Sequence, residues 1–268
     1  MKSMEQALFI SKVDSLKYYE DTDEFARLYF GMEFCERLLP NVDDLKNVIN
    51  FVNEKKIGLT LVTPYVTEDG LKRVERLLNV LNEQKPGSEV VFNDWGVFHL
   101  LSDNYAGLVP VLGRLLNKMK RGPRLMNVLD KIPEESVRYY RSPGITVPKV
   151  REFLLKNRIN RVEFDNLLQG IDLERTGDEI RKSLYLPFAY ITTTRLCLTA
   201  LCDQPDRVKE VGILPCGHEC QRYTFCLKNP IMIANLIRKG NTIFLCNEDI
   251  PDNLRMFDRV VIEPEIPI

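Results

Sequence analysis

Runs of apolar residues alternate along the chain with segments whose apolar residues recur at helical spacing. Helical spacing marks residues 41–56, 67–84 and 147–159, with shorter helical stretches at 95–101 and 176–183. Repeated strand–helix alternation predicts an α/β fold with a mainly parallel sheet. A strand count near eight favours a TIM-like (β/α) barrel over an open sheet. The strand-like runs cover residues 27–34, 57–66, 89–94, 107–113, 161–166, 184–194, 241–247 and 259–264.

The length of 268 residues suits a single barrel domain over residues 1–268. Residues 114–146 carry several turn signals and are predicted to form an irregular excursion from it. No helix follows the last strand-like run, which leaves open an incomplete or irregularly closed barrel. No glycine-rich phosphate-binding loop follows an early strand, so nothing indicates a nucleotide-binding fold.

Charge and hydropathy give no reason to expect binding to DNA or insertion into a membrane. The formal net charge is -1 at pH 7, which gives no whole-chain reason to bind DNA or an acidic membrane surface. No apolar run of about 18 residues occurs, so no membrane span is predicted. The N-terminal segment turns acidic where a signal peptide needs an apolar core. The expected location is the cytoplasm.

The cysteines are unevenly distributed. Five of the seven fall within residues 195–226, with the spacing C-x4-C-x13-C-x3-C-x5-C. The C-x2-C pair typical of zinc knuckles and of thioredoxin-like redox sites is absent. Iron–sulfur clusters accept wider spacings, because four thiolates need only surround a cube-like cofactor. Buried free cysteines are the alternative, but the polar "LPCGHECQRY" is a poor place to bury thiols. The pattern favours a metal site, with iron–sulfur ahead of zinc.

Cysteines that are distant in sequence are expected to converge. Functional residues of a barrel lie at the C-terminal ends of its strands. Cys35 directly follows the run 27–34, Cys197 follows the run 184–194, and Cys246 lies near the end of the run 241–247. A barrel would therefore bring these cysteines to one rim.

Several motifs together resemble a known family. They are "LYFGMEFCERL", "VVFNDWGVFHLL", "LPFAYITTTRLCLTA", "CGHECQRY" and "NTIFLCNEDI". The chain resembles the collagenase-like peptidase family U-32. Within that family it is most similar to the UbiV-like iron–sulfur members of oxygen-independent ubiquinone biosynthesis.

The resemblance implies a (β/α) barrel that carries one [4Fe–4S] cluster. Matched position by position, its ligands would be Cys35, Cys197, Cys216 and Cys220. It also implies an oxygen-independent hydroxylation or related redox step, on a quinone precursor or RNA, and a heterodimer with a second family member.

The sequence departs from the family pattern around these ligands. The gap between Cys197 and Cys216 is longer, and Leu196 interrupts the usual Arg–Cys pair. Cys202 or Cys226 could therefore replace one of the assigned ligands, and Cys246 is additional.

Two other functions stay open at this stage. One is a peptidase of the same family, with zinc or no metal, and the other is a non-catalytic cluster-bearing subunit of a complex. A Cys–His protease would need an activating histidine. His99 lies in an apolar stretch and is predicted to be semi-buried and hydrogen-bonded. His218 lies between two proposed ligands, where a role at the cluster and a surface position are both open.

Other polar residues lie near the predicted strand ends. Asp94, Glu163 and Asp165 could hold a substrate or act as a general base, but capping and loop hydrogen bonds are favoured. Trp95 could line a pocket or lie in the core. The basic residues are expected on a solvated loop that could also bind phosphate, carboxylate, RNA or an acidic partner; they are Arg114 and those within residues 117–124.

Overall fold

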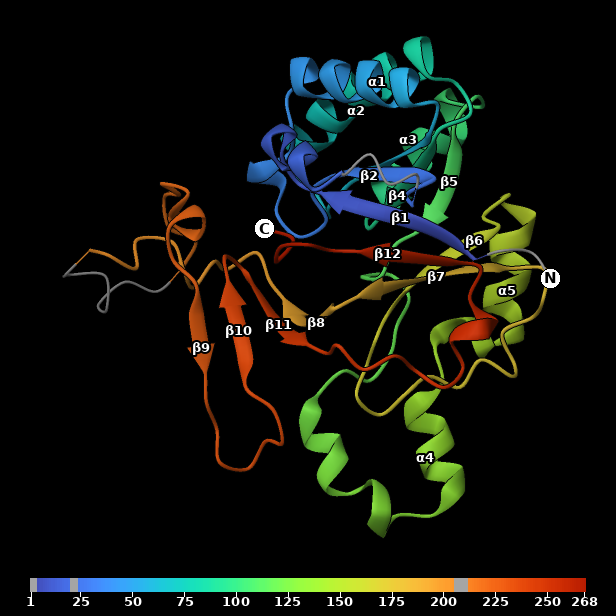
Figure 1. Cartoon of the computed structure of the whole chain (residues 1–268), viewed down its shortest axis with the longest axis vertical. Coiled ribbons are helices and arrows are strands. Elements are labelled where there is room, and N and C mark those ends of the chain that lie inside the picture. Colours follow the sequence, from blue (N-terminus) through green and yellow to red (C-terminus); the bar gives the residue numbers. More distant parts are fainter. Residues whose placement is uncertain (1–3, 20–23, 205–211) are drawn as a thin grey trace.

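Eight parallel strands form a closed barrel in the computed structural model, which describes residues 4–19, 24–204 and 212–268 (Figure 1). The strands follow one another around the barrel in the order β1, β12, β7, β6, β5, β4, β3 and β2. The TIM-like α/β fold is therefore confirmed. The strands are β1 (Glu5–Ile10), β2 (Arg27–Gly31), β3 (Gly58–Val62), β4 (Glu89–Phe92), β5 (Val109–Leu112), β6 (Arg161–Asp165), β7 (Arg181–Leu186) and β12 (Arg259–Ile262).

Four of the described α-helices lie around the outside of the barrel: α1 (Val42–Lys55), α2 (Glu68–Gln84), α3 (Trp95–Asn104) and α5 (Pro148–Lys156). A further helix, α4 (Glu134–Arg141), lies away from the barrel strands (Figure 1). In α1, Asn41 and Asp44 form a reciprocal capping box, and the residues predicted to face the core are buried. In α2, the Thr67 side chain accepts a hydrogen bond from the Gly70 amide, which confirms Thr67 as the predicted N-cap. None of the described helices is long and apolar enough to cross a membrane.

The structure corrects several of the predicted elements. β1 was not among the predicted strands, and its parallel pairing with β12 closes the barrel completely. The predicted helix over 176–183 is wrong, because Arg181–Leu186 forms β7. The single strand predicted for 184–194 divides at Pro187, which lacks the amide needed to continue the ladder. Its second half leaves the barrel as β8 (Phe188–Thr193).

A second sheet lies beside the barrel (Figure 1). It is antiparallel, in the order β8, β11 (Thr242–Cys246), β10 (Leu236–Lys239) and β9 (Phe225–Leu227). The predicted run 241–247 therefore belongs to this sheet and not to the barrel. The polypeptide reaches the sheet directly from β7 and returns to the barrel at β12, so the sheet is an insertion before the last barrel strand.

Along each barrel strand, side chains point alternately outward and inward. The outward-pointing side chains pack against the helices, and the inward-pointing ones form a separate buried cluster that includes Tyr29, Tyr185 and Val261. Above and below this inner cluster the barrel interior is charged. Glu5, Glu89 and Arg259 meet at the N-terminal end of the barrel, with Arg259–carboxylate distances of 2.6 and 2.7 Å. The interior is thus filled, not hollow.

Candidate metal centre

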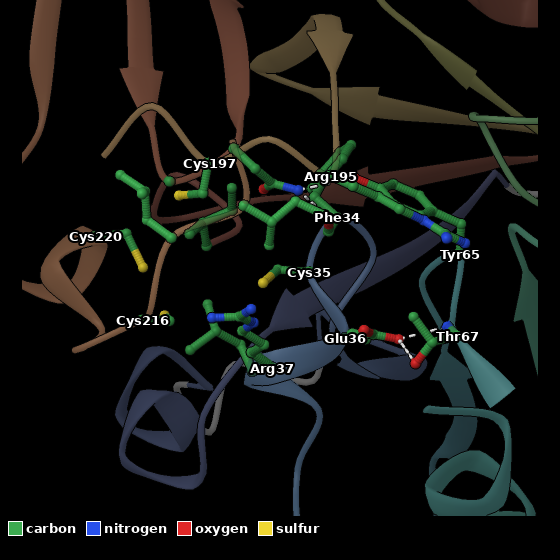
Figure 2. A pocket seen from close by; sticks show the side chains of 16 residues that line it. Phe34, Cys35, Glu36, Arg37, Tyr65, Thr67, Arg195, Cys197, Cys216 and Cys220 are labelled. Atoms are coloured by element: carbon green, nitrogen blue, oxygen red, sulfur yellow. Dashed lines mark hydrogen bonds between the residues drawn. The ribbon is translucent and has the colours of Figure 1, made fainter. Parts of the chain in front are cut away.

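Four cysteines from three parts of the chain line one cavity of about 190 Å³ (Figure 2). Cys35 follows β2, Cys197 follows β8, and Cys216 and Cys220 precede β9. Their sulfur atoms point into the same space in Figure 2. These are the four cysteines that the family resemblance implies as ligands, and Cys35 follows the second barrel strand of the chain rather than the first.

The barrel and the second sheet are joined where Cys35 lies. The Phe34 ring packs against Phe244 and Tyr190, with ring centroids 5.1 and 5.6 Å apart. The Asn241 side-chain amide donates to the Phe34 carbonyl at 2.7 Å and to the Thr194 carbonyl at 2.9 Å. A single side chain therefore connects the loop that carries Cys35 to the loop that carries Cys197.

The remaining two cysteines lie on a tight turn. His218 adopts a left-handed backbone with φ of 56°, which brings Cys220 back toward Cys216. The buried Glu219 carboxylate accepts hydrogen bonds from the Gly217 amide at 3.1 and 3.2 Å. The Gln221 side chain donates to the Cys220 sulfur at 3.5 Å. The turn thus presents both thiols to the cavity on a fixed backbone.

The thiols influence each other's ionisation. The pKa of Cys35 is raised to about 11, mainly by burial and to a smaller extent by the neighbouring thiols of Cys220, Cys197 and Cys216, against a hydrogen bond with the Arg37 backbone. The pKa of Cys220 is raised by burial and by Cys197 and Cys216, against the hydrogen bond from Gln221. Four thiolates cannot share this cavity without a cation, because desolvation and like charges both oppose ionisation.

The described cysteine side chains are not arranged around a single metal ion. Among the described residues, no group of three or more His, Cys, Asp or Glu side chains is arranged to hold a metal ion. A tetrahedral zinc ion with bonds of about 2.3 Å would need its sulfur ligands within about 4 Å of one another. An iron–sulfur cluster distributes its four thiolate ligands over several iron atoms, so these ligands can lie farther apart.

Positive side chains border the same cavity. Arg37 and Arg195 line it, and the Arg195 guanidinium donates to the Val66 carbonyl at 2.9 Å. Glu36 also lines it, but its carboxylate accepts from the Thr67 amide and hydroxyl at 2.6 and 3.0 Å. The cavity therefore combines four thiols with two guanidinium groups, an environment suited to a negatively charged group.

The three remaining cysteines do not line this cavity. Cys226 on β9 and Cys246 at the end of β11 are exposed, and Cys202 is partly buried. The expectation that Cys246 would join the rim is wrong, because its strand belongs to the second sheet. Residues 205–211 of the predicted cysteine-rich segment 195–226 lie outside the described residues.

Neither histidine lines the cysteine cavity. His99 is exposed on α3 and lies 3.4 Å from the Asp103 carboxylate, so the prediction of a semi-buried residue is wrong. His218 is exposed on the turn between Cys216 and Cys220 and faces a different hollow. No Cys–His pair therefore forms at this site.

Asp94 and Trp95 lie on the outer layer of the barrel. The Asp94 carboxylate caps α3 by accepting from the Gly96 amide at 2.7 Å, which confirms the capping interpretation. Trp95 is 48% exposed and packs edge-on against Phe153. It is therefore neither a core residue nor part of the cysteine cavity.

The other candidates, Arg114, Glu163 and Asp165, are completely buried inside the barrel. Arg114 does not lie on a solvated loop, because it is 0% exposed and contacts Glu33, Asp165 and Glu263 at 2.5, 3.1 and 2.8 Å. Asp165 also pairs with Arg121. These groups close the C-terminal end of the barrel with ion pairs, so the loop and capping interpretations were wrong.

Glu163 lies deeper in the barrel. It accepts a hydrogen bond from the Tyr29 hydroxyl at 3.2 Å, and burial raises its pKa to about 7. The sequence offered a signal for these buried charges, because Glu163 and Asp165 alternate with apolar residues on β6. Glu33 and Glu263, just beyond β2 and β12, were missed.

Comparisons with known proteins concern the backbone arrangement. No family model and no curated protein matches the chain. Among solved structures, the U32 peptidase Mk0906 matches with 11% identity and a TM-score of 0.49, over 100% of this chain and 96% of that chain. An Ostrinia furnacalis Group IV chitinase in complex with allosamidin matches with 7% identity and a TM-score of 0.33, over 97% of this chain and 91% of that chain. The chain is thus similar along its whole length to a U32 peptidase structure, at low identity.

Proposed function

We propose that the protein is an iron–sulfur protein whose [4Fe–4S] cluster is bound by Cys35, Cys197, Cys216 and Cys220. The observation that carries the proposal is the convergence of these four thiols on one cavity. Their number matches the four thiolates that hold a cubane cluster.

The cluster would supply one-electron redox chemistry when bound. The residues of this chain shield and hold the site. Phe34, Leu38 and Ile268 give the cavity apolar walls, and Arg37 and Arg195 bring positive charge that favours a negatively charged cofactor. The reaction proposed is an oxygen-independent hydroxylation or a related redox step in the cytoplasm.

The substrate and partner are proposed on the family resemblance. A quinone precursor or an RNA would be the substrate, and a second member of the family would complete a heterodimer. Fold-level analogy alone supports the partner.

Anaerobic purification tests the cofactor directly. The protein is expected to be brown, with broad absorbance near 400 nm and about four iron and four sulfide per chain. Cys35→Ala should abolish the cluster, because it removes the one ligand contributed by the barrel. Cys246→Ala, an exposed cysteine outside the cavity, is the matched control and should keep full iron content.

Two results would contradict the assignment. A colourless protein with stoichiometric zinc, or with no metal, would exclude the cluster. A complete cluster in Cys35→Ala would refute that ligand and require Cys202 or Cys226 in its place.

The alternatives differ in what they require of the site. A peptidase of the Cys–His type is disfavoured, because neither histidine lines the cavity. A non-catalytic cluster-bearing subunit would give the same iron content. An anaerobic turnover assay with a chemical reductant separates the enzyme from the subunit, since only the enzyme modifies a substrate.

A further inference from the structure

A second hollow opens beside the cysteine cavity, at the C-terminal side of the barrel. It has a volume of about 410 Å³ and lies between β8 and the segments that follow β3, β4 and β5. We call it the rim cleft. Its lining includes Tyr65, Asn93, Leu115, Lys118, Met119 and Tyr190.

The rim cleft lies beside the barrel axis because the axis itself is closed. Arg114 and its three carboxylate partners have fully buried side chains below the cleft. The Arg121 guanidinium stacks 3.8 Å from the centre of the Tyr190 ring, and it is held by the Asp165 carboxylate. A ligand therefore meets a rigid floor and cannot enter the barrel.

One side chain separates the rim cleft from the cysteine cavity. Tyr65 lines both of them. Its hydroxyl accepts from the Asn241 amide at 2.8 Å and lies 3.4 Å from the Thr193 hydroxyl. Asn241 lines the cysteine cavity and Thr193 lines the rim cleft. A molecule in the cleft would therefore lie one tyrosine away from the four thiols.

The lining defines the chemistry of the ligand. Leu115, Met119 and the Tyr190 ring offer apolar surface to a flat body. Lys118 supplies a positive charge; its ammonium donates to the Leu115 carbonyl at 3.0 Å, and it forms no ion pair with a described residue. No acidic residue is among the described residues that line the cleft. The charge of Arg121 is already matched by Asp165.

We propose that the rim cleft binds a small organic anion with a flat apolar body, and that Lys118 pairs with the anionic group. Binding follows from the cleft alone, whereas its role as the substrate site rests on the proposed function. Tyr65 would then position the ligand against the cysteine cavity.

Benzoate is a suitable probe, titrated calorimetrically into the full-length protein with and without reconstituted iron and sulfide. Benzoate should bind, and benzamide, which has the same ring without the charge, should bind about tenfold more weakly. Lys118→Met should weaken benzoate binding about tenfold. Lys120→Met is the matched control, because Lys120 lies two residues away and does not line the cleft; it should change affinity less than about twofold.

The outcomes separate this inference from the proposed function. Equal affinity of benzoate for the protein and for Lys118→Met, or no binding of benzoate, would overturn the cleft assignment whatever the iron content. Lys118-dependent binding by a protein that takes up no cluster would support the cleft and overturn the cofactor. Circular dichroism of both variants verifies that they are folded, so a lost affinity reports the cleft.

Discussion

Asn241 shows how one side chain organises the candidate centre. Its amide nitrogen lies within hydrogen-bond distance of the Phe34 carbonyl, the Tyr65 hydroxyl and the Thr194 carbonyl. These acceptors belong to segments that are distant in sequence. Because two proposed ligands, Cys35 and Cys197, each lie within three residues of an acceptor, the amide fixes their separation.

Asn241→Ala is expected to reduce the iron bound per chain without unfolding the protein. The variant removes a polar clamp but leaves the apolar contact between Phe34 and Phe244 in place. Iron analysis after anaerobic reconstitution measures the effect. Asn235→Ala, at an exposed asparagine before β10, should retain full iron content. Equal iron in both variants would show that Asn241 does not position the ligands.

A different residue-scale effect concerns Glu263. Burial raises its pKa to about 8; Arg114 opposes this, while Glu33 and Asp165 add to it. The ordinary pKa is 4.5. Between these two values the folded protein binds more protons at this site than the unfolded chain, so stability falls as pH rises across that window.

Glu263→Gln should flatten the pH dependence of unfolding free energy between pH 5 and 8 by up to about 1.4 kcal/mol per pH unit. The amide keeps an acceptor for Arg114 but does not ionise. Urea unfolding at several pH values measures the slope. Glu248→Gln, at an exposed site, should leave the slope as it is in the unaltered protein. A slope unchanged by Glu263→Gln would mean that this carboxyl does not hold its proton in the fold.

At the scale of elements, β8 determines where the functional site can form. The Arg114 guanidinium donates to the Phe188 carbonyl at 2.9 Å, and the Tyr190 amide donates to the Asp165 carboxylate at 3.0 Å. The buried charges thus hold β8 across the C-terminal end of the barrel. This covers the usual position of a barrel active site and leaves the cysteine cavity at its side.

Arg114→Met should destabilise the protein by about 3–5 kcal/mol, because it leaves buried carboxylates without their partner. The effect is measured as a shift of the urea unfolding midpoint. Arg76→Met, on the exposed face of α2, should change stability by less than about 0.5 kcal/mol. A small effect of Arg114→Met would show that the buried carboxyl groups around Arg114 are already neutralised by bound protons.

Elements with a local sequence signal could be predicted, whereas elements that depend on neighbouring strands could not. α1 and α2 have regular apolar stripes and clear caps, and both were predicted. The segment that forms β7 has no such local signal. Residues 176–183 suggested a helix, and only pairing with β6 and β12 on both sides makes Arg181–Leu186 a strand.

On the scale of the whole molecule, the barrel could be predicted but its contents could not. Strand–helix alternation is a local pattern, and it identifies the fold class. The ion cluster around Arg114 unites residues from positions 33 to 263, which no local pattern relates. The grouping of Cys35 with the later cysteines came from a family resemblance and from the rim argument, while the cavity they share depends on the insertion of the second sheet.

The division of the four thiols between two parts of the molecule has a consequence for stability. Cys35 belongs to the barrel, whereas Cys197, Cys216 and Cys220 belong to segments around the second sheet. A cofactor that binds all four would connect these parts, and binding energy available only in the folded state adds to stability. The increase should be concentrated in the second sheet, since the barrel strands are already held by neighbours on both sides.

Hydrogen exchange of the cluster-loaded and metal-free proteins measures this effect. Amides of β9, β10 and β11 should exchange at least about tenfold more slowly in the loaded protein, because opening the sheet would break thiolate bonds. Amides of β3 and β4, on the barrel but away from the thiols, serve as the internal control and should differ less than about twofold. Equal exchange of the second sheet in both forms would show that the four thiols do not hold a common cofactor.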